Sequence, residues 1–130
     1  MNGLSDYQDI RRKGLVEGAS PHALTLLLFD GALSRLKVAN TLTELCDMGA
    51  RHTCLDRSLA IVQELQGALR DPDTNPLSGQ LFSLYMFVTD QILKADRTRD
   101  NTPLASAIQV LSELRSGWAA MEPEPMAQAA

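Results

Sequence analysis

A long apolar helix that begins at Ser20-Pro21 is the feature that most constrains the fold of this chain. The Ser20 hydroxyl can cap the helix, and Pro21 occupies a position where a missing N–H costs nothing. From Pro21 to about Cys46 a single polar stripe is formed by Asp30, Ser34, Lys37, Thr41 and Glu44. Apolar surface covers most of the circumference, whereas a helix that merely closes a bundle needs one apolar face. The pattern therefore predicts either the central helix of a bundle or a helix that offers one flank to a partner.

Three further helices are predicted by apolar residues at helical spacing, over about 51–70, 77–96 and 102–121. The links between the helices are short, and the link over 71–76 contains two prolines that exclude helix there. Short links make consecutive helices antiparallel neighbours. No segment shows the alternating pattern of a strand. We therefore expect an all-α fold, an antiparallel up-and-down four-helix bundle over residues 19–121.

The helix predicted over about 77–96, which is the third helix of the bundle, has more apolar residues than a bundle requires. Its predicted core stripe is Leu77, Leu81, Leu84, Tyr85, Val88, Ile92 and Ala95. A second apolar flank carries Phe82, Met86 and Leu93. Surplus apolar surface on a helix is the physical basis for binding another protein. The first and third helices are therefore the candidate binding elements.

Both ends of the chain are expected to lie outside the bundle. Residues 1–18 contain three glycines and are predicted to form a mobile arm, or a short helix that docks conditionally. Tyr7 and Ile10 lie one helical turn apart and give this arm a small apolar face. Residues 122–130 read Glu-Pro-Glu-Pro followed mostly by small residues and are predicted to be a disordered tail.

Composition narrows the classes of protein to which the chain can belong. Its 130 residues suffice for one domain, and 45% apolar with 22% charged residues is ordinary for a globular protein. A net charge of -4 without a basic cluster disfavours binding to nucleic acid. There is no apolar run long enough for membrane insertion and no signal peptide pattern. We expect a cytoplasmic protein whose two cysteines, Cys46 and Cys54, are small apolar side chains.

Residues capable of chemistry do not form a recognisable catalytic or cofactor site. Cys46, His52 and Cys54 lack the spacing of a zinc site, and no Glu-x-x-His pair suggests a di-iron bundle. No Gly-rich phosphate loop or nucleophile–base set is evident, so we expect no enzyme, no metal and no cofactor. His22 and His52 leave a histidine phosphotransfer bundle as an alternative. Both histidines fall near helix starts, which is more typical of a solvated or capping residue.

The order and spacing of several motifs resemble one protein family over nearly the whole chain. Residues 19–24 read Ala-Ser-Pro-His-x-Leu and residues 28–32 read Leu-Phe-Asp-Gly-Ala, as at the start of the flagellin-specific secretion chaperones, the FliS family. Tyr7 lies where many members carry a tyrosine, and Leu84-Tyr85 resembles the Leu-Tyr of the family's third helix. Residues 111–118, which end in Trp118, resemble its fourth helix.

The resemblance implies a cytoplasmic chaperone that binds the C-terminal segment of newly made flagellin. In the family this segment is disordered when free and forms helices around the chaperone, which prevents premature polymerisation and keeps flagellin competent for flagellar type III secretion. On this basis client binding is expected at flank residues, Leu28 and Met86 being expected to be exposed. The complete expected set is Leu24, Leu28, Ala32, Phe82, Tyr85 and Met86. Tyr7 and Ile10 are expected to act as a displaceable plug in the client groove.

The sequence departs from the family pattern at several positions, so binding partners other than flagellin remain alternatives. After Leu84-Tyr85 the family usually has an acidic residue, a tyrosine and then two arginines, whereas this chain has Met86, Phe87, Asp90 and Gln91. The alternatives are a divergent paralogue with another flagellar client, or binding to other flagellar export or regulatory proteins. A third alternative is a homodimer in which the surplus apolar flanks pair.

Overall fold

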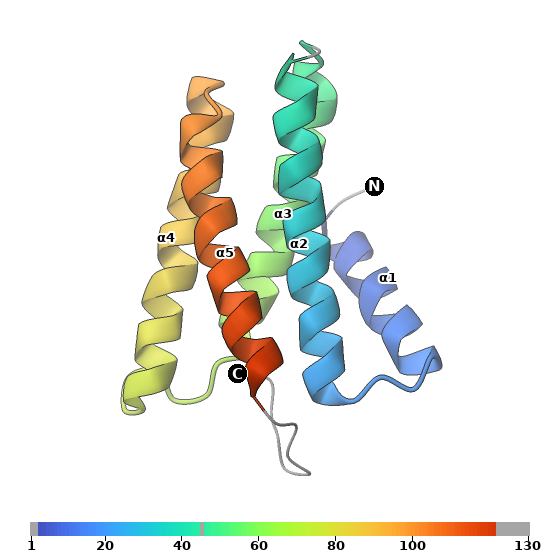
Figure 1. Cartoon of the computed structure of the whole chain (residues 1–130), viewed down its shortest axis with the longest axis vertical. Helices are drawn as coiled ribbons and strands as arrows, with labels where there is room; N and C mark the ends of the chain where they lie inside the picture. The colour runs from blue at the N-terminus through green and yellow to red at the C-terminus, as the bar shows by residue number, and fades with distance from the viewer. Residues whose placement is uncertain (1–2, 45, 122–130) are drawn as a thin grey trace.

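The computed structural model describes residues 3–44 and 46–121, which form five α-helices and no strand (Figure 1). The helices are α1 (Gly3–Val16), α2 (Pro21–Glu44), α3 (Met48–Gly67), α4 (Pro76–Thr98) and α5 (Thr102–Ala120). The prediction of an all-α fold is confirmed. The tail predicted over 122–130 lies outside the described residues.

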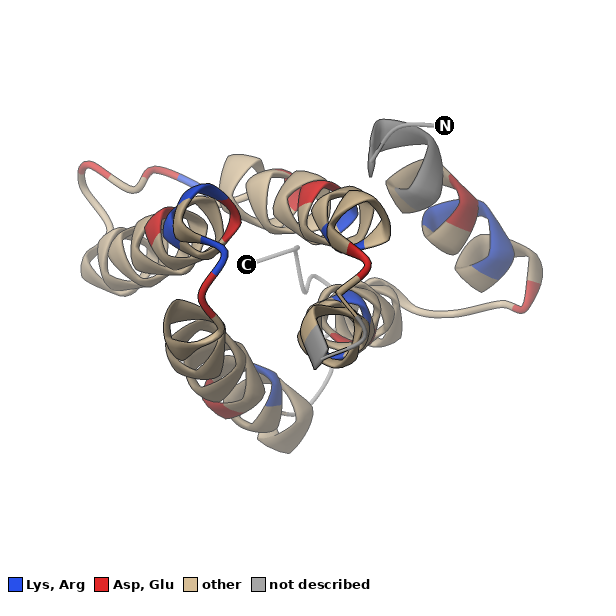
Figure 2. Cartoon of the chain, turned by 90° about the horizontal axis from the view of Figure 1, so that it is seen from above, with Lys and Arg blue, Asp and Glu red and all other residues tan. Residues whose placement is uncertain are grey.

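Helices α2 to α5 surround a common core, and α1 lies outside it. α2 packs on α3 and α5, and α4 packs on the same two helices. α1 contacts α2 and α3 and stands apart from the other helices in both views of the chain (Figures 1 and 2). The core includes Phe29 of α2 and Tyr85 of α4, whose rings lie 6.4 Å apart between centroids. The apolar circumference of α2 follows from this arrangement, because α2 has three neighbours rather than two.

The link between α2 and α3 is shorter than expected. α3 begins at Met48 rather than near residue 51 as predicted, so Gly49 lies inside it. The cause is Asp47, whose carboxylate accepts a 3.2 Å hydrogen bond from the Ala50 N–H and caps the helix. The left-handed residue of this link is Cys46, with φ of 59°.

The predicted core stripe of α4 is correct at its centre and wrong at two positions. Tyr85, Val88 and Ile92 are buried. Leu77 and Leu84, by contrast, are 60% and 39% exposed. Leu77 lies in the first turn of α4. Leu84 lies at the margin of the apolar stripe and stays accessible, because α4 is covered only where α3 and α5 contact it.

A buried arginine joins the helices at one end of the bundle. Arg51 of α3 is 1% exposed, and nothing in the sequence distinguished it from a surface arginine. Its guanidinium donates to the Thr43 hydroxyl at 2.6 Å and to the Ala95 carbonyl at 3.1 Å. It also donates to the Asp100 carbonyl and the Asn101 side chain. Arg51 therefore connects the ends of α2 and α4 to the start of α5.

Another polar contact lies where α2 begins and α5 ends. His22 is 7% exposed, so the expectation of a solvated or capping histidine is wrong at this position. The His22 ring stacks on Trp118, and each residue hydrogen-bonds to the backbone carbonyl of the other. His22 Nε2 and the Trp118 indole N–H can be buried at this contact because each has a hydrogen-bond partner.

Candidate functional site

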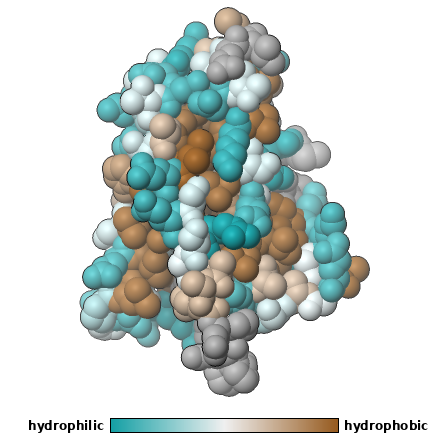
Figure 3. All heavy atoms as spheres, viewed as in Figure 1, coloured by the Kyte–Doolittle hydropathy of each residue, from teal (hydrophilic) through white to brown (hydrophobic). Residues whose placement is uncertain are grey.

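Apolar side chains that remain accessible concentrate on α4. Phe82, Met86 and Leu93 are 38–45% exposed, and their spacing of four and seven residues places them on one side of the helix. Leu84 and Phe87 form a second exposed apolar edge. On the face drawn in Figure 3, apolar surface gathers over α4 and along the junction of α2 with α1. The predicted surplus on the third helix is therefore accessible surface.

The first of these α4 flanks borders α3. Asp96 lies one turn beyond Leu93, and its carboxylate contacts His52 Nδ1 of α3 at 2.8 Å. The flank formed by Phe82, Met86 and Leu93 therefore follows the α3 side of α4, whereas the edge formed by Leu84 and Phe87 follows the other side. A helix lying along either side would bury apolar surface without displacing the core.

The residues expected to bind a client occupy three different environments. Phe82 and Met86 are exposed on α4. Tyr85 and Ala32 are fully buried in the core, and burial raises the pKa of the Tyr85 hydroxyl to about 12. Leu28 is 6% exposed, so the expectation that it is an exposed flank residue is wrong. Leu24 and Leu28 lie beside the N-terminal helix.

The N-terminal helix α1 covers a side of α2 that faces neither α3 nor α5. Tyr7 and Ile10 are half-buried and pack against the core. A cavity of about 260 Å³ remains beneath α1, lined by residues of α1, α2 and α3 that include Tyr7, Leu24, Leu28 and Leu65. Tyr7, one of the two plug residues, therefore lines the same space as two of the expected client residues, Leu24 and Leu28.

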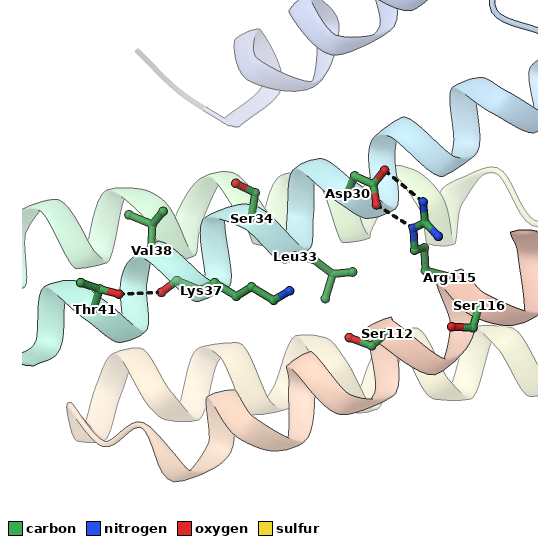
Figure 4. Close-up of a pocket in the computed structure, with 9 residues that line it drawn as sticks. All are labelled: Asp30, Leu33, Ser34, Lys37, Val38, Thr41, Ser112, Arg115 and Ser116. Carbon is green, nitrogen blue, oxygen red and sulfur yellow. Dashed lines mark hydrogen bonds and ion pairs between the residues drawn. The ribbon is translucent and has the colours of Figure 1, made fainter.

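The polar stripe of α2 lines a different concavity, between α2 and α5 (Figure 4). This groove has a volume of about 630 Å³. Across it the Arg115 guanidinium donates to Asp30 at 2.7 Å, and this contact raises the pKa of Arg115. The remainder is lined by Lys37, by the apolar side chains of Leu33 and Val38, and by the hydroxyls of Ser34, Thr41, Ser112 and Ser116. Its lining is therefore mixed, whereas the flanks of α4 are apolar.

Groups suited to metal binding do not assemble in the part of the chain that the structure describes. No group of three or more His, Cys, Asp or Glu residues is close enough to hold an ion there. Cys46 is exposed and Cys54 is half-buried. None of the helices in the described ranges is long and apolar enough to span a membrane.

Comparison with known proteins gives one consistent result. The family model described as flagellar protein FliS matches residues 3–125. The flagellar secretion chaperone FliSB of Pseudomonas aeruginosa is 28% identical over 118 residues, which cover 91% of this chain and 94% of the relative. The flagellar secretion chaperone FliS of Vibrio cholerae is 26% identical over 121 residues, covering 93% and 89%. That of Salmonella typhimurium is 27% identical over 124 residues, covering 95% and 92%.

The match extends from α1 to the end of α5 and includes the α4 flanks and the helix that covers α2. The family is one of chaperones and not of enzymes. The chain belongs to the FliS family of flagellar proteins.

Proposed function

We propose that the chain is a cytoplasmic export chaperone for flagellin. It binds the disordered C-terminal segment of flagellin, prevents premature polymerisation and keeps the subunit competent for flagellar type III secretion. In this proposal α2 to α5 act as an antiparallel up-and-down bundle that provides a rigid surface on which the client forms helices.

The observation that carries the proposal is the exposed apolar surface of α4. Phe82, Met86 and Leu93 line one side of this helix, with Leu84 and Phe87 on the other. A client that folds on binding needs long, shallow apolar surfaces rather than one deep pocket, because it must bury the apolar faces of its own new helices. Family membership supports the same role, since relatives carry the name flagellar secretion chaperone.

The second part of the proposal concerns α1, which acts as a displaceable plug. Tyr7 lines the cavity together with Leu24 and Leu28 of α2, and Ile10 lies over Gly31. These parts of α2 are covered while α1 is docked. The cavity beneath α1 means that the docked helix fills its site incompletely. A client helix with larger apolar side chains would fill this site better and displace the arm.

Titration of a flagellin C-terminal segment into the full-length protein tests the proposal. We expect one-to-one binding with a gain of helix by circular dichroism and a negative heat-capacity change by calorimetry, because apolar surface is buried as the segment folds. The matched control is the same segment with the apolar residues of its amphipathic stretches replaced by serine. Binding of both segments with equal affinity, or no binding of the native one, would contradict the proposal.

Sedimentation over a concentration range tests the alternative of a homodimer. If the α4 surface binds a client, the free protein should be monomeric or should form a weak dimer that the flagellin C-terminal segment dissociates. A tight dimer that persists in the presence of the segment would instead assign the α4 flanks to self-association. The phosphotransfer alternative gains no support, because His22 is buried against Trp118 and His52 contacts Asp96.

A further inference from the structure

We propose that the client helix that replaces α1 binds at the same site with the same pattern of side chains, so that α1 is a template for it. The inference rests on the proposed function and adds a recognition pattern to it. The client helix presents a large apolar residue, an aliphatic residue three positions later and a small residue seven positions later. In α1 these positions are held by Tyr7, Ile10 and Gly14. The aliphatic side chain enters a notch in α2 that exists because residue 31 is glycine.

The Gly31 notch is the most specific contact under α1. A methyl group placed on Gly31 would lie 2.7 Å from Ile10 Cδ1, closer than two carbon atoms can approach. The same methyl would lie 3.5 Å from the Arg35 guanidinium and from Ile61 Cδ1, which are ordinary contacts. Ile10 is therefore the side chain that a methyl group on Gly31 would displace, whereas the nearest atoms of α2 and α3 leave room for it.

The small residue of the pattern is explained by the close approach of α1 to the start of α2. A methyl group on Gly14 would lie 2.7 Å from Leu24 Cδ1 and 3.1 Å from Leu27 Cδ1. Gly14 is itself buried. A helix in the position of α1 therefore fits best with a small residue where it crosses Leu24, because a larger one would have to displace the ends of the Leu24 and Leu27 side chains.

The cavity beneath α1 explains how a client competes with the arm. The exposed Arg11 lies at this cavity, whose apolar wall includes Leu24, Leu28 and Leu65. An arginine head group stays in water and does not fill an apolar space. A client helix with a large apolar residue at the corresponding position, four residues after the start of the pattern, gains contacts that the arm lacks.

Full-length variants with the arm released isolate the contact between the client and the notch. Tyr7→Ser with Ile10→Ser removes the two apolar contacts of the arm, and release is read as faster tryptic cleavage at Arg11 and Arg12. In this background we compare Gly31→Ala with Gly117→Ala. Gly117 is the matched control, because it lies within α5 and a methyl group there meets no atom within 4 Å.

We expect the Gly31→Ala protein to bind the flagellin C-terminal segment about tenfold more weakly than the Gly117→Ala protein, because overpacking disfavours the bound state. Shortening the segment's aliphatic residue to alanine should remove that difference, because the segment then leaves room for the added methyl. Equal binding by the two glycine variants, or a difference that persists with the shortened segment, would overturn the template. Failure of the wild-type and arm-released proteins to bind the native segment would overturn the proposed function itself.

Discussion

His22 and Trp118 lock the start of α2 to the end of α5 by reciprocal hydrogen bonds. The Trp118 indole N–H donates to the His22 carbonyl at 2.9 Å, and His22 Nε2 donates to the Trp118 carbonyl at 2.8 Å. The rings stack with centroids 5.3 Å apart. Two residues separated by most of the chain thus bond to each other's backbone, and the Trp118 carbonyl also accepts from the Met121 N–H at 3.1 Å.

Trp118→Phe tests the hydrogen-bonding part of this contact. The phenyl ring can still stack on His22, but the His22 carbonyl loses its indole donor. We expect the free energy of unfolding in urea to fall by about 1 kcal/mol, the usual net contribution of one hydrogen bond. Met121→Ala, a change at the exposed residue just beyond α5, should leave it unchanged. Equal stabilities for Trp118→Phe and the native protein would show that stacking alone holds the ends together.

Arg51 gives a larger expected effect, because its partners lie on three other segments. Arg51→Met removes the donors to Thr43, Ala95, Asp100 and Asn101 while keeping much of the side-chain volume. We expect a loss of about 3 kcal/mol, because the buried Ala95 carbonyl and three part-buried acceptors lose their donor together. Arg51→Lys keeps the charge and part of the bonding and should be intermediate. A methionine variant as stable as the native protein would mean that desolvation of the guanidinium cancels its hydrogen bonds.

Apolar spacing predicted the helices well but could not predict residues whose role depends on distant partners. Phe29, Val62 and Leu111 are buried as helical periodicity indicates, since each lies on the face of its helix that meets the bundle. Arg51 looks like an exposed residue in a first turn, because its acceptors come from segments more than forty residues away as well as from α2.

In the candidate site, too, helical spacing alone did not show which apolar residues are covered by another part of the chain. Helical spacing placed Leu28 and Met86 alike on apolar flanks, yet Leu28 is buried and Met86 is 45% exposed. The difference arises from α1, which lies against α2 and leaves α4 uncovered. Whether a short N-terminal helix docks depends on a few contacts such as Ile10 over Gly31, which no periodicity encodes.

Tyr85 should make stability depend on pH above neutrality. Burial raises its folded-state pKa to about 12 from 10.0, so the native protein holds the hydroxyl proton more tightly than the unfolded chain. This contribution is complete below pH 10 and is lost as the pH rises from 10 towards 12. Between pH 9 and pH 11 we expect a loss of about 1.4 kcal/mol attributable to this group, from the value of one pKa unit.

Tyr85→Phe is the control for this pH dependence. The variant lacks the titrating hydroxyl, so the difference in free energy of unfolding between the native protein and the variant should change with pH over this range. Lysines and the remaining tyrosine, which are common to both proteins, cancel in that difference. A difference that stays constant from pH 9 to pH 11 would show that the Tyr85 hydroxyl reaches water in the folded protein.

Met86→Ser tests whether the exposed flank of α4 binds rather than stabilises. Because Met86 lies outside the core, the free energy of unfolding should change by no more than about 0.5 kcal/mol, as for most surface substitutions. Affinity for the flagellin C-terminal segment should fall about tenfold if this side chain is a central apolar contact. Phe29→Ala supplies the contrast, since truncating a buried phenylalanine should cost ~3–5 kcal/mol of stability. Unchanged affinity for Met86→Ser and for the corresponding Phe82→Ser and Leu93→Ser variants would place the client elsewhere, because this flank offers no other large exposed apolar side chain among the described residues of α4.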